Sequence, residues 1–226
     1  MEIMENRNEN LPRACNICGS TKFGAGPNGR MAENGMPPRC EGCQSLERHR
    51  ATREVMVKLR KPLEFSRRRV LQFSHDRTVE RQWFISYELS IYGGGNSLEL
   101  QRIDRPSGSY DFVICNHVLE HVPDDTKALM EMARITSEQG FVFLTVPAPH
   151  RLTTTTEWGY PDEKQHGHYR IYGKDIVTRF ERFIPGIIAV EIPMRDPVTG
   201  VPDVAFLLTR SEPTADQLRA LLQKTE

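Results

Sequence analysis

The segment SGSYDFVICNHVLEHVPDDTKALMEMARITSEQGFVFLTVP, residues 107–147, contains the strongest structural pattern in the chain. Two almost wholly apolar runs, 110–115 and 141–146, have the composition of strands that are covered on both faces of a sheet. Between them, residues 124–136 place apolar side chains at helical spacing, and an aspartate at the start of this segment can cap the helix. Strand, helix and strand in this order predict two parallel strands of an α/β sheet.

The same alternation of elements continues on both sides of this segment. Pro62 is expected to end the first helix, Gly140 the helical region before 141–146, and a turn around 197–200 is expected to join the last two strands in a hairpin. The other strands that we expect are 70–73, 84–89, 187–192 and 204–209, and the other helices are 45–60, 173–183 and 214–224. The pattern predicts an α/β fold with a doubly wound sheet.

Composition indicates a globular chain but no particular partner. The 226 residues include 38% hydrophobic and 27% charged residues, and 30 basic residues cancel 30 acidic ones. The charge of residues 48–69 is unbalanced, with nine Lys or Arg and only two Glu. This run has two interpretations, a solvated helix face or a nucleic-acid patch, and the absence of interleaved aromatic residues favours the first.

Neither a secretory signal nor a membrane span is recognisable. The first residues, MEIMENRNEN, lack an apolar core, and no run approaches the roughly 20 apolar residues that a membrane helix needs. We therefore expect a cytoplasmic protein without membrane association, whose thiols are reduced.

Four of the five cysteines form two C-x2-C pairs. Cys15 and Cys18 are separated from Cys40 and Cys43 by 21 residues, and two such pairs can bind one tetrahedral zinc ion. The alternative is two disulfides or free thiols, which a reducing compartment makes the weaker interpretation. Because all four ligands would be thiolates, the zinc is expected to be structural.

These observations divide the chain into three parts. Residues 1–12 are expected to be a flexible tail, 13–46 a zinc-ribbon module, and 47–226 the α/β domain. In doubly wound sheets, ligands bind beyond the carboxyl ends of the strands. Asn116 and His117 directly follow a predicted strand, so they are expected to reach that crevice.

The sequence resembles the class I S-adenosylmethionine-dependent methyltransferases of the type 11-like group. The resemblance is clearest over 107–147, and the segments CQSLERHR (43–50) and HGHYRIYGKD (166–175) resemble a bacterial group with an N-terminal C-x2-C module. Together these matches extend over about 13–210. The resemblance implies a Rossmann-like sheet of seven strands, a zinc ribbon, and S-adenosylmethionine as cofactor.

The resemblance also implies which residues contact the cofactor. Glu88 would accept the ribose hydroxyls, because a carboxylate can take two charge-assisted hydrogen bonds, and Glu99 would bind the adenine amino group. The usual glycine-rich loop after the first strand is absent, since the sequence there is QFSHDRTVER (72–81). The implied cofactor-binding residues are Gln72, Phe73, Ser74, His75, Glu88, Glu99, Asn116 and His117.

Two histidines are the candidate catalytic residues. His117 and His121 are four residues apart, so one helical face could present both to the crevice, where a histidine can remove a proton from the acceptor. His121 could instead only pack against or cap the helix, and His117 is expected to line the cofactor rather than to abstract a proton. Another interpretation is a metal site formed by His117, Glu120 and His121, with His150 as a fourth ligand.

Residues 153–173 follow the expected strand 141–146, where insertions that recognise the acceptor often lie in this family. A packed tryptophan and solvent-facing histidines would explain the same residues without a substrate. The candidate substrate-binding residues are Glu157, Trp158, His166, His168, Tyr169 and Arg170.

The favoured function is a methyltransferase that acts at an oxygen of a small-molecule or glycan acceptor. One alternative is an RNA methyltransferase, because some enzymes that methylate ribosomal RNA guanine place a four-ligand zinc module before this fold and residues 48–69 would bind phosphates. The other is a non-catalytic binding protein with a methyltransferase-like fold, which the missing glycine-rich loop supports.

Overall fold

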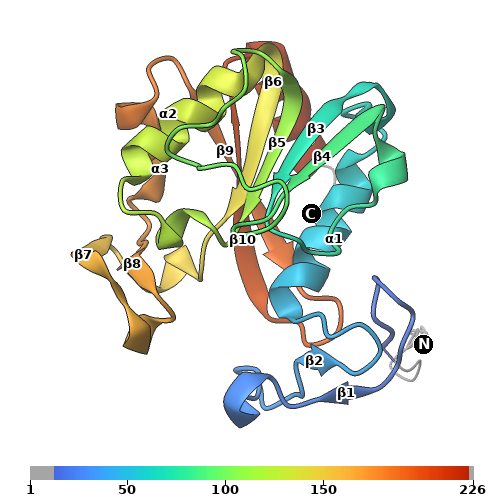
Figure 1. The fold of residues 1–226 in the computed structure, drawn as a ribbon. Helices are drawn as coiled ribbons and strands as arrows, with labels where there is room; N and C mark the ends of the chain where they lie inside the picture. The colour runs from blue at the N-terminus through green and yellow to red at the C-terminus, as the bar shows by residue number, and fades with distance from the viewer. Residues whose placement is uncertain (1–12, 224–226) are drawn as a thin grey trace, which may run out of the picture.

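A computed structural model describes residues 13–223 of the chain, and its centre is a mixed six-stranded sheet (Figure 1). The strand order is β4-β3-β5-β6-β10-β9. The first four strands are parallel, and β10 runs antiparallel to both of its neighbours. The strands are β3 (Arg69–Phe73), β4 (Ser86–Ser90), β5 (Tyr110–Asn116), β6 (Thr136–Thr145), β9 (Ile188–Arg195) and β10 (Pro202–Thr209).

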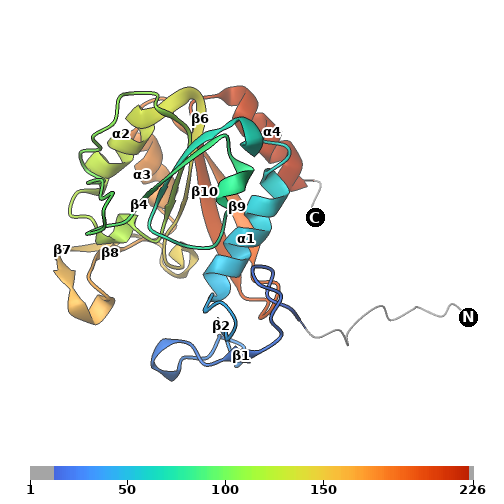
Figure 2. The same ribbon diagram turned by 45° about the vertical axis from the view of Figure 1, so that its right-hand side comes forward.

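Two helices cover each face of the sheet (Figure 2). Successive side chains of a strand point to opposite faces, so Val113 and Cys115 pack with α2 and α3, whereas Phe112 and Ile114 pack with α1 and α4. Both faces of β5 are therefore buried, as its apolar sequence predicts. The helices are α1 (Glu47–Leu59), α2 (Asp125–Ile135), α3 (Ile176–Phe183) and α4 (Glu212–Gln223).

The prediction of seven strands is wrong for the part of the chain that the structure describes, because the main sheet there has six. After β4, residues 91–109 form turns rather than another strand. This segment contains three consecutive glycines at 93–95, and its apolar side chains Leu98, Leu100 and Ile103 pack into the core. Consecutive glycines disfavour a strand, so the segment begins as a turn after β4.

Gly140 does not end a helix, contrary to expectation. Helix α2 ends at Ile135 and β6 begins at once with Thr136, so Gly140 lies inside the strand. A Cβ atom there would lie 2.8 Å from the backbone oxygen of Asp111. The glycine therefore permits the close approach of β5 and β6 at an irregularity in their pairing.

The cysteine-rich module is a small β-hairpin unit. Strand β1 (Phe23–Gly24) pairs antiparallel with β2 (Arg39–Cys40). The module contacts the β9–β10 turn, where Asn34 Nδ2 donates to the oxygen of Thr199 at 2.6 Å. Its position is therefore coupled to the last hairpin of the main sheet.

A second hairpin, β7 (Thr156–Asp162) with β8 (His168–Ile171), follows β6 and lies beside the sheet (Figure 1). It contacts the turn Leu119–His121, which follows β5. The insertion is therefore placed near the carboxyl end of β5. Within residues 13–223, no helix is long and apolar enough to cross a lipid bilayer.

Candidate active site

The four paired cysteines lie together. Their sulfur atoms are all within 4.8 Å of one another, with 3.7 Å between Cys15 and Cys43 and 3.5 Å between Cys18 and Cys40. Sulfurs at 2.3 Å from a tetrahedral zinc would be about 3.8 Å apart, so the cluster is compatible with one zinc ion. All four cysteines are free of disulfides. Gly42 permits the close packing, since a Cβ atom there would lie 3.2 Å from the sulfur of Cys18.

A cavity of about 170 Å³ lies at the carboxyl ends of β3, β5 and β6. The first turns of α1 form its other wall. Burial and the charge of Arg48 lower the pKa of His49 to about 4, so this histidine is neutral at pH 7. Its lining residues are Arg48, His49, Thr52, Ser74, His75, Asp76, Thr78, Asn116, His117 and Thr145.

Asp76 joins the two strand ends that form this cavity. One carboxylate oxygen accepts from Gln72 Nε2 at 2.9 Å and from the backbone N–H of Thr78 at 3.0 Å. The other oxygen accepts from Asn116 Nδ2 at 2.9 Å. The segment that replaces a glycine-rich loop is thus held by a carboxylate.

The sequence predicts Ser74, His75, Asn116 and His117 at the strand ends, and the structure brings these four together. Asp76 and the lining residues of α1 were not predicted. The acid in Ser-His-Asp at the end of a predicted strand was the available signal for Asp76. The motif CQSLERHR (43–50) was the available signal for Arg48 and His49, but nothing in it indicated that α1 would close the cavity.

His117 occupies the junction between β5 and the following turn. Its φ of 52° is unusual for a residue other than glycine, and its N–H donates to the oxygen of Thr145 at 2.9 Å. Its Nδ1 lies 3.6 Å from Glu120 Oε1, while its Nε2 is buried without a hydrogen-bond partner among the described residues. Burial raises the pKa of Glu120, but His117 outweighs this effect and holds it below its usual value. The pair resembles a carboxylate-oriented histidine base.

His117 and His121 do not share a helical face, contrary to expectation. The left-handed backbone of His117 is incompatible with a helix that runs from 117 to 121. Leu119–His121 form only a 3-10 turn, and α2 begins at Asp125. His121 is exposed and absent from the lining of the cavity. Its ring instead contacts His168, with 4.6 Å between ring centroids.

The other implied cofactor residues lie outside this cavity. Gln72 is fully buried, and its side chain contacts Tyr87 and Asp76; Phe73 is part of the core. Glu88 accepts from Arg105, Tyr110 and Asn96. Glu99 accepts from the side chain and backbone of Gln101. The cofactor roles of these four residues remain predictions.

The candidate substrate residues lie on or beside the β7–β8 hairpin in different environments. Trp158 Nε1 donates to the oxygen of His168 at 2.9 Å, and Glu157 pairs with Arg179. Arg170 is buried and donates to backbone oxygens of the 119–123 turn. His166 is exposed at the hairpin tip and Tyr169 is half-buried. Arg170 therefore joins β8 to the 119–123 turn, and its contact with a substrate stays a prediction.

The basic run 48–69 is largely paired within the protein. Arg60 stacks over Trp83 with 5.0 Å to the ring centroid. The pair that is fully buried, Arg50–Asp196, gives Arg50 a structural role, whereas Lys58 and Arg67 pair at the exposed surface. The ion pairs are Arg50–Asp196, Arg53–Glu80, Lys58–Glu54, Arg67–Glu64 and Arg69–Asp111.

A family model described as a methyltransferase domain matches residues 48–183. The chain belongs to this methyltransferase family. It is accordingly an enzyme that uses S-adenosylmethionine to methylate an acceptor. The matched range contains the cavity at the strand ends and the β7–β8 hairpin.

The chain is similar to solved methyltransferase structures. The 1,6-didemethyltoxoflavin-N1-methyltransferase of Burkholderia thailandensis, bound to 1,6-didemethyltoxoflavin and S-adenosylhomocysteine, is 12% identical, with a TM-score of 0.52 over 72% of this chain and 80% of that one. A Thermotoga maritima S-adenosylmethionine-dependent methyltransferase is 12% identical, with a TM-score of 0.48 over 72% and 91% of the two chains. A search of curated protein sequences found no significant match.

Proposed function

We propose that this methyltransferase transfers the methyl group to an oxygen of a small-molecule or glycan acceptor, with His117 as the general base. The observation that carries the proposal is that His117 Nε2 has no hydrogen-bond partner within residues 13–223. His117 lines the cavity, and Glu120 faces its other ring nitrogen. A base in this position would take the proton of an acceptor hydroxyl. The cofactor supplies an already activated methyl group, so alignment and proton removal are the tasks left to the protein.

The cofactor is assigned to the strand-end loops that contain Ser74, His75, Asn116 and His117. His75 and Asp76 line both this cavity and a neighbouring one of about 360 Å³, which extends beside β4 to Tyr87 and Leu89. The two hollows together provide the room for the cofactor that the smaller cavity lacks. The cysteine cluster is assigned a structural zinc ion, since four thiolates leave no open coordination position.

Replacing His75 with alanine is expected to weaken S-adenosylhomocysteine binding about tenfold, a loss of about 1.4 kcal/mol. His75 lines both hollows and is exposed, so its removal takes away a ligand contact without opening the core. Isothermal titration calorimetry of the zinc-loaded protein measures the affinity. The matched control is His166→Ala, an exposed histidine outside both hollows. Equal affinities for the two variants would contradict the cofactor assignment.

His117→Ala is expected to lower the rate of methyl transfer by about 10²–10⁴-fold, because it removes the base. The measurement is S-adenosylhomocysteine release with hydroxyl-bearing small molecules and oligosaccharides, using the best acceptor found with the wild type. Calorimetry with S-adenosylhomocysteine on the same variant separates a lost base from a lost cofactor site. A variant that keeps the wild-type rate would exclude His117 as the base.

A further inference from the structure

A second group of metal-ligating side chains lies away from the cysteines. Ligand atoms of Glu120, His121 and His168 are all within 4.8 Å of one another. Glu120 and His121 come from the turn after β5, whereas His168 begins β8, 47 residues later. The fold therefore assembles two imidazoles and one carboxylate from separate segments.

One carboxylate oxygen of Glu120 has no hydrogen-bond partner within residues 13–223. Glu120 is 1% exposed, and its Oε2 has no hydrogen-bond partner among the described residues. Its Oε1 faces His117 Nδ1 at 3.6 Å. A buried carboxylate oxygen without a partner is costly, and a bound cation is one of the few groups that removes that cost.

The surrounding contacts hold His168 in this position. The oxygen of His168 accepts from Trp158 Nε1 at 2.9 Å, which fixes the strand across the hairpin. Two residues further on, Arg170 donates to the backbone oxygen of Val122 at 2.6 Å and to that of Pro123 at 2.7 Å. These bonds fasten β8 to the turn that presents Glu120 and His121, so the group is supported from both segments.

The geometry points to a divalent metal site at Glu120, His121 and His168, with zinc as the ion that the donor set fits best. Two histidines and one glutamate form a known set of protein ligands for zinc sites that keep a position open. That position would take water or a heteroatom of the acceptor.

The site differs from the alternative that the sequence suggested. His168 takes the place of His117, whose Nδ1 faces Glu120 and whose ring lines the cavity. The predicted fourth ligand His150 is exposed in the turn after β6 and is not part of the group. Because the inference concerns metal binding alone, it does not depend on the acceptor or on His117 acting as a base.

Metal stoichiometry of the full chain tests the inference. Apo-protein is titrated with Zn²⁺ and, separately, with Co²⁺, whose thiolate charge-transfer absorption reports only the cysteine site. The wild type is expected to bind two ions per chain: one at the four cysteines and one at the new site. His168→Ala is expected to bind one, with the thiolate absorption unchanged, and the matched control His166→Ala is expected to bind two.

His121→Ala is the second variant, since His121 is exposed and its removal leaves the core intact. It is also expected to bind one ion. A wild type that binds only the thiolate-held ion would overturn the inference and would mean that His117 and neighbouring charges alone balance Glu120. Two ions retained by both His168→Ala and His121→Ala would overturn it as well.

Discussion

Cys40→Ser is expected to unfold residues 13–46 while the main sheet stays folded. This module buries few apolar side chains, and Cys15 and Cys40 are among the most buried of them. A segment without its own core depends on the metal for its folding free energy. Trypsin is expected to cleave after Lys22, Arg30 or Arg39 at least about tenfold faster than in the zinc-loaded wild type, because cleavage follows the population of the open form. Mass spectrometry of the fragments locates the cuts.

Cys115→Ala is the matched control for this experiment. Cys115 is the one cysteine outside the cluster and is buried in β5, so its loss should leave the thiolate-bound zinc and the trypsin pattern of the module unchanged. Chelation of the wild type is expected to reproduce the Cys40→Ser pattern. A module that stays resistant to trypsin without its metal would show that its contacts with the β9–β10 turn are sufficient to fold it.

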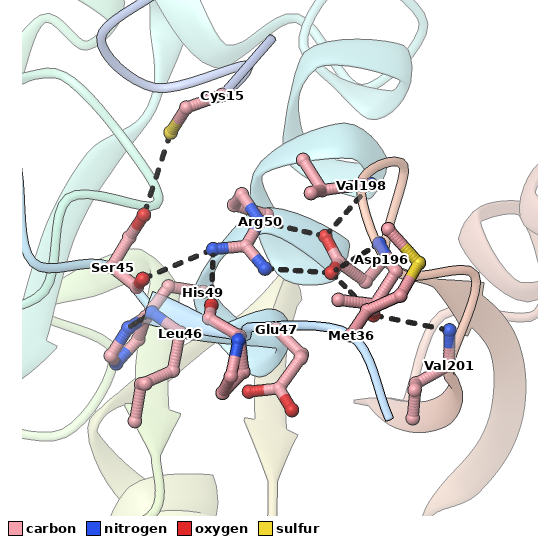
Figure 3. A network of polar contacts seen from close by, with 12 residues as sticks. Cys15, Met36, Ser45, Leu46, Glu47, His49, Arg50, Asp196, Val198 and Val201 are labelled. Atoms are coloured by element: carbon pink, nitrogen blue, oxygen red, sulfur yellow. Dashed lines mark hydrogen bonds and ion pairs between the residues drawn. The ribbon is translucent and has the colours of Figure 1, made fainter. Parts of the chain in front are cut away.

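Arg50→Ala is expected to lower the free energy of unfolding by about 3–5 kcal/mol, as is typical when one partner of a buried ion pair is removed. The Arg50 guanidinium is fully buried and donates to both oxygens of Asp196, at 2.8 and 2.7 Å. It also donates to the backbone oxygen of Ser45 in the cysteine-rich segment (Figure 3). A further bond goes to the backbone oxygen of Pro38 in the same segment. One side chain thus joins the module, α1 and the β9–β10 turn. Urea unfolding measures the change.

Arg67→Ala provides the matched control, because Arg67 pairs with Glu64 at the exposed surface. Its effect is expected to stay below about 1 kcal/mol. A loss for Arg50→Ala no larger than that of Arg67→Ala would contradict the role of the buried pair. The double variant Arg50→Met with Asp196→Leu is expected to recover part of the loss, because it leaves no buried charge unpaired.

The same ion pair predicts how stability depends on pH. Burial raises the pKa of Asp196, but hydrogen bonds from Arg50 and Thr199 hold it below its ordinary value of 3.8. The pair therefore stabilises the wild type above that value and loses its contribution as pH falls through the lower, folded pKa. In Arg50→Ala, protonation instead relieves an unpaired buried carboxylate. The stability difference between the two proteins is therefore expected to shrink on acidification.

The main elements and the four-cysteine cluster were predictable because their signals are local. The apolar run 110–115 and the helical spacing of 124–136 are close to the observed β5 and α2. The paired spacing of Cys15 and Cys18 with Cys40 and Cys43 predicted a cluster that the structure confirms. The sequence did not predict that 91–109 form turns or that β6 continues through Gly140. At Gly140 the reason is a close contact with the distant residue Asp111.

What the sequence by itself determined is the order of the six main-sheet strands and the four helices, the four-cysteine cluster and the arrival of Asn116 and His117 at a strand end. These properties follow from periodicity and from spacing within short segments. Only the tertiary structure decided that α1 closes the cavity and that Asp76 joins its two loops. It also brought His168 to Glu120. Those neighbours are far apart in the chain, and their contacts arise only when the sheet, the module and the hairpin pack together.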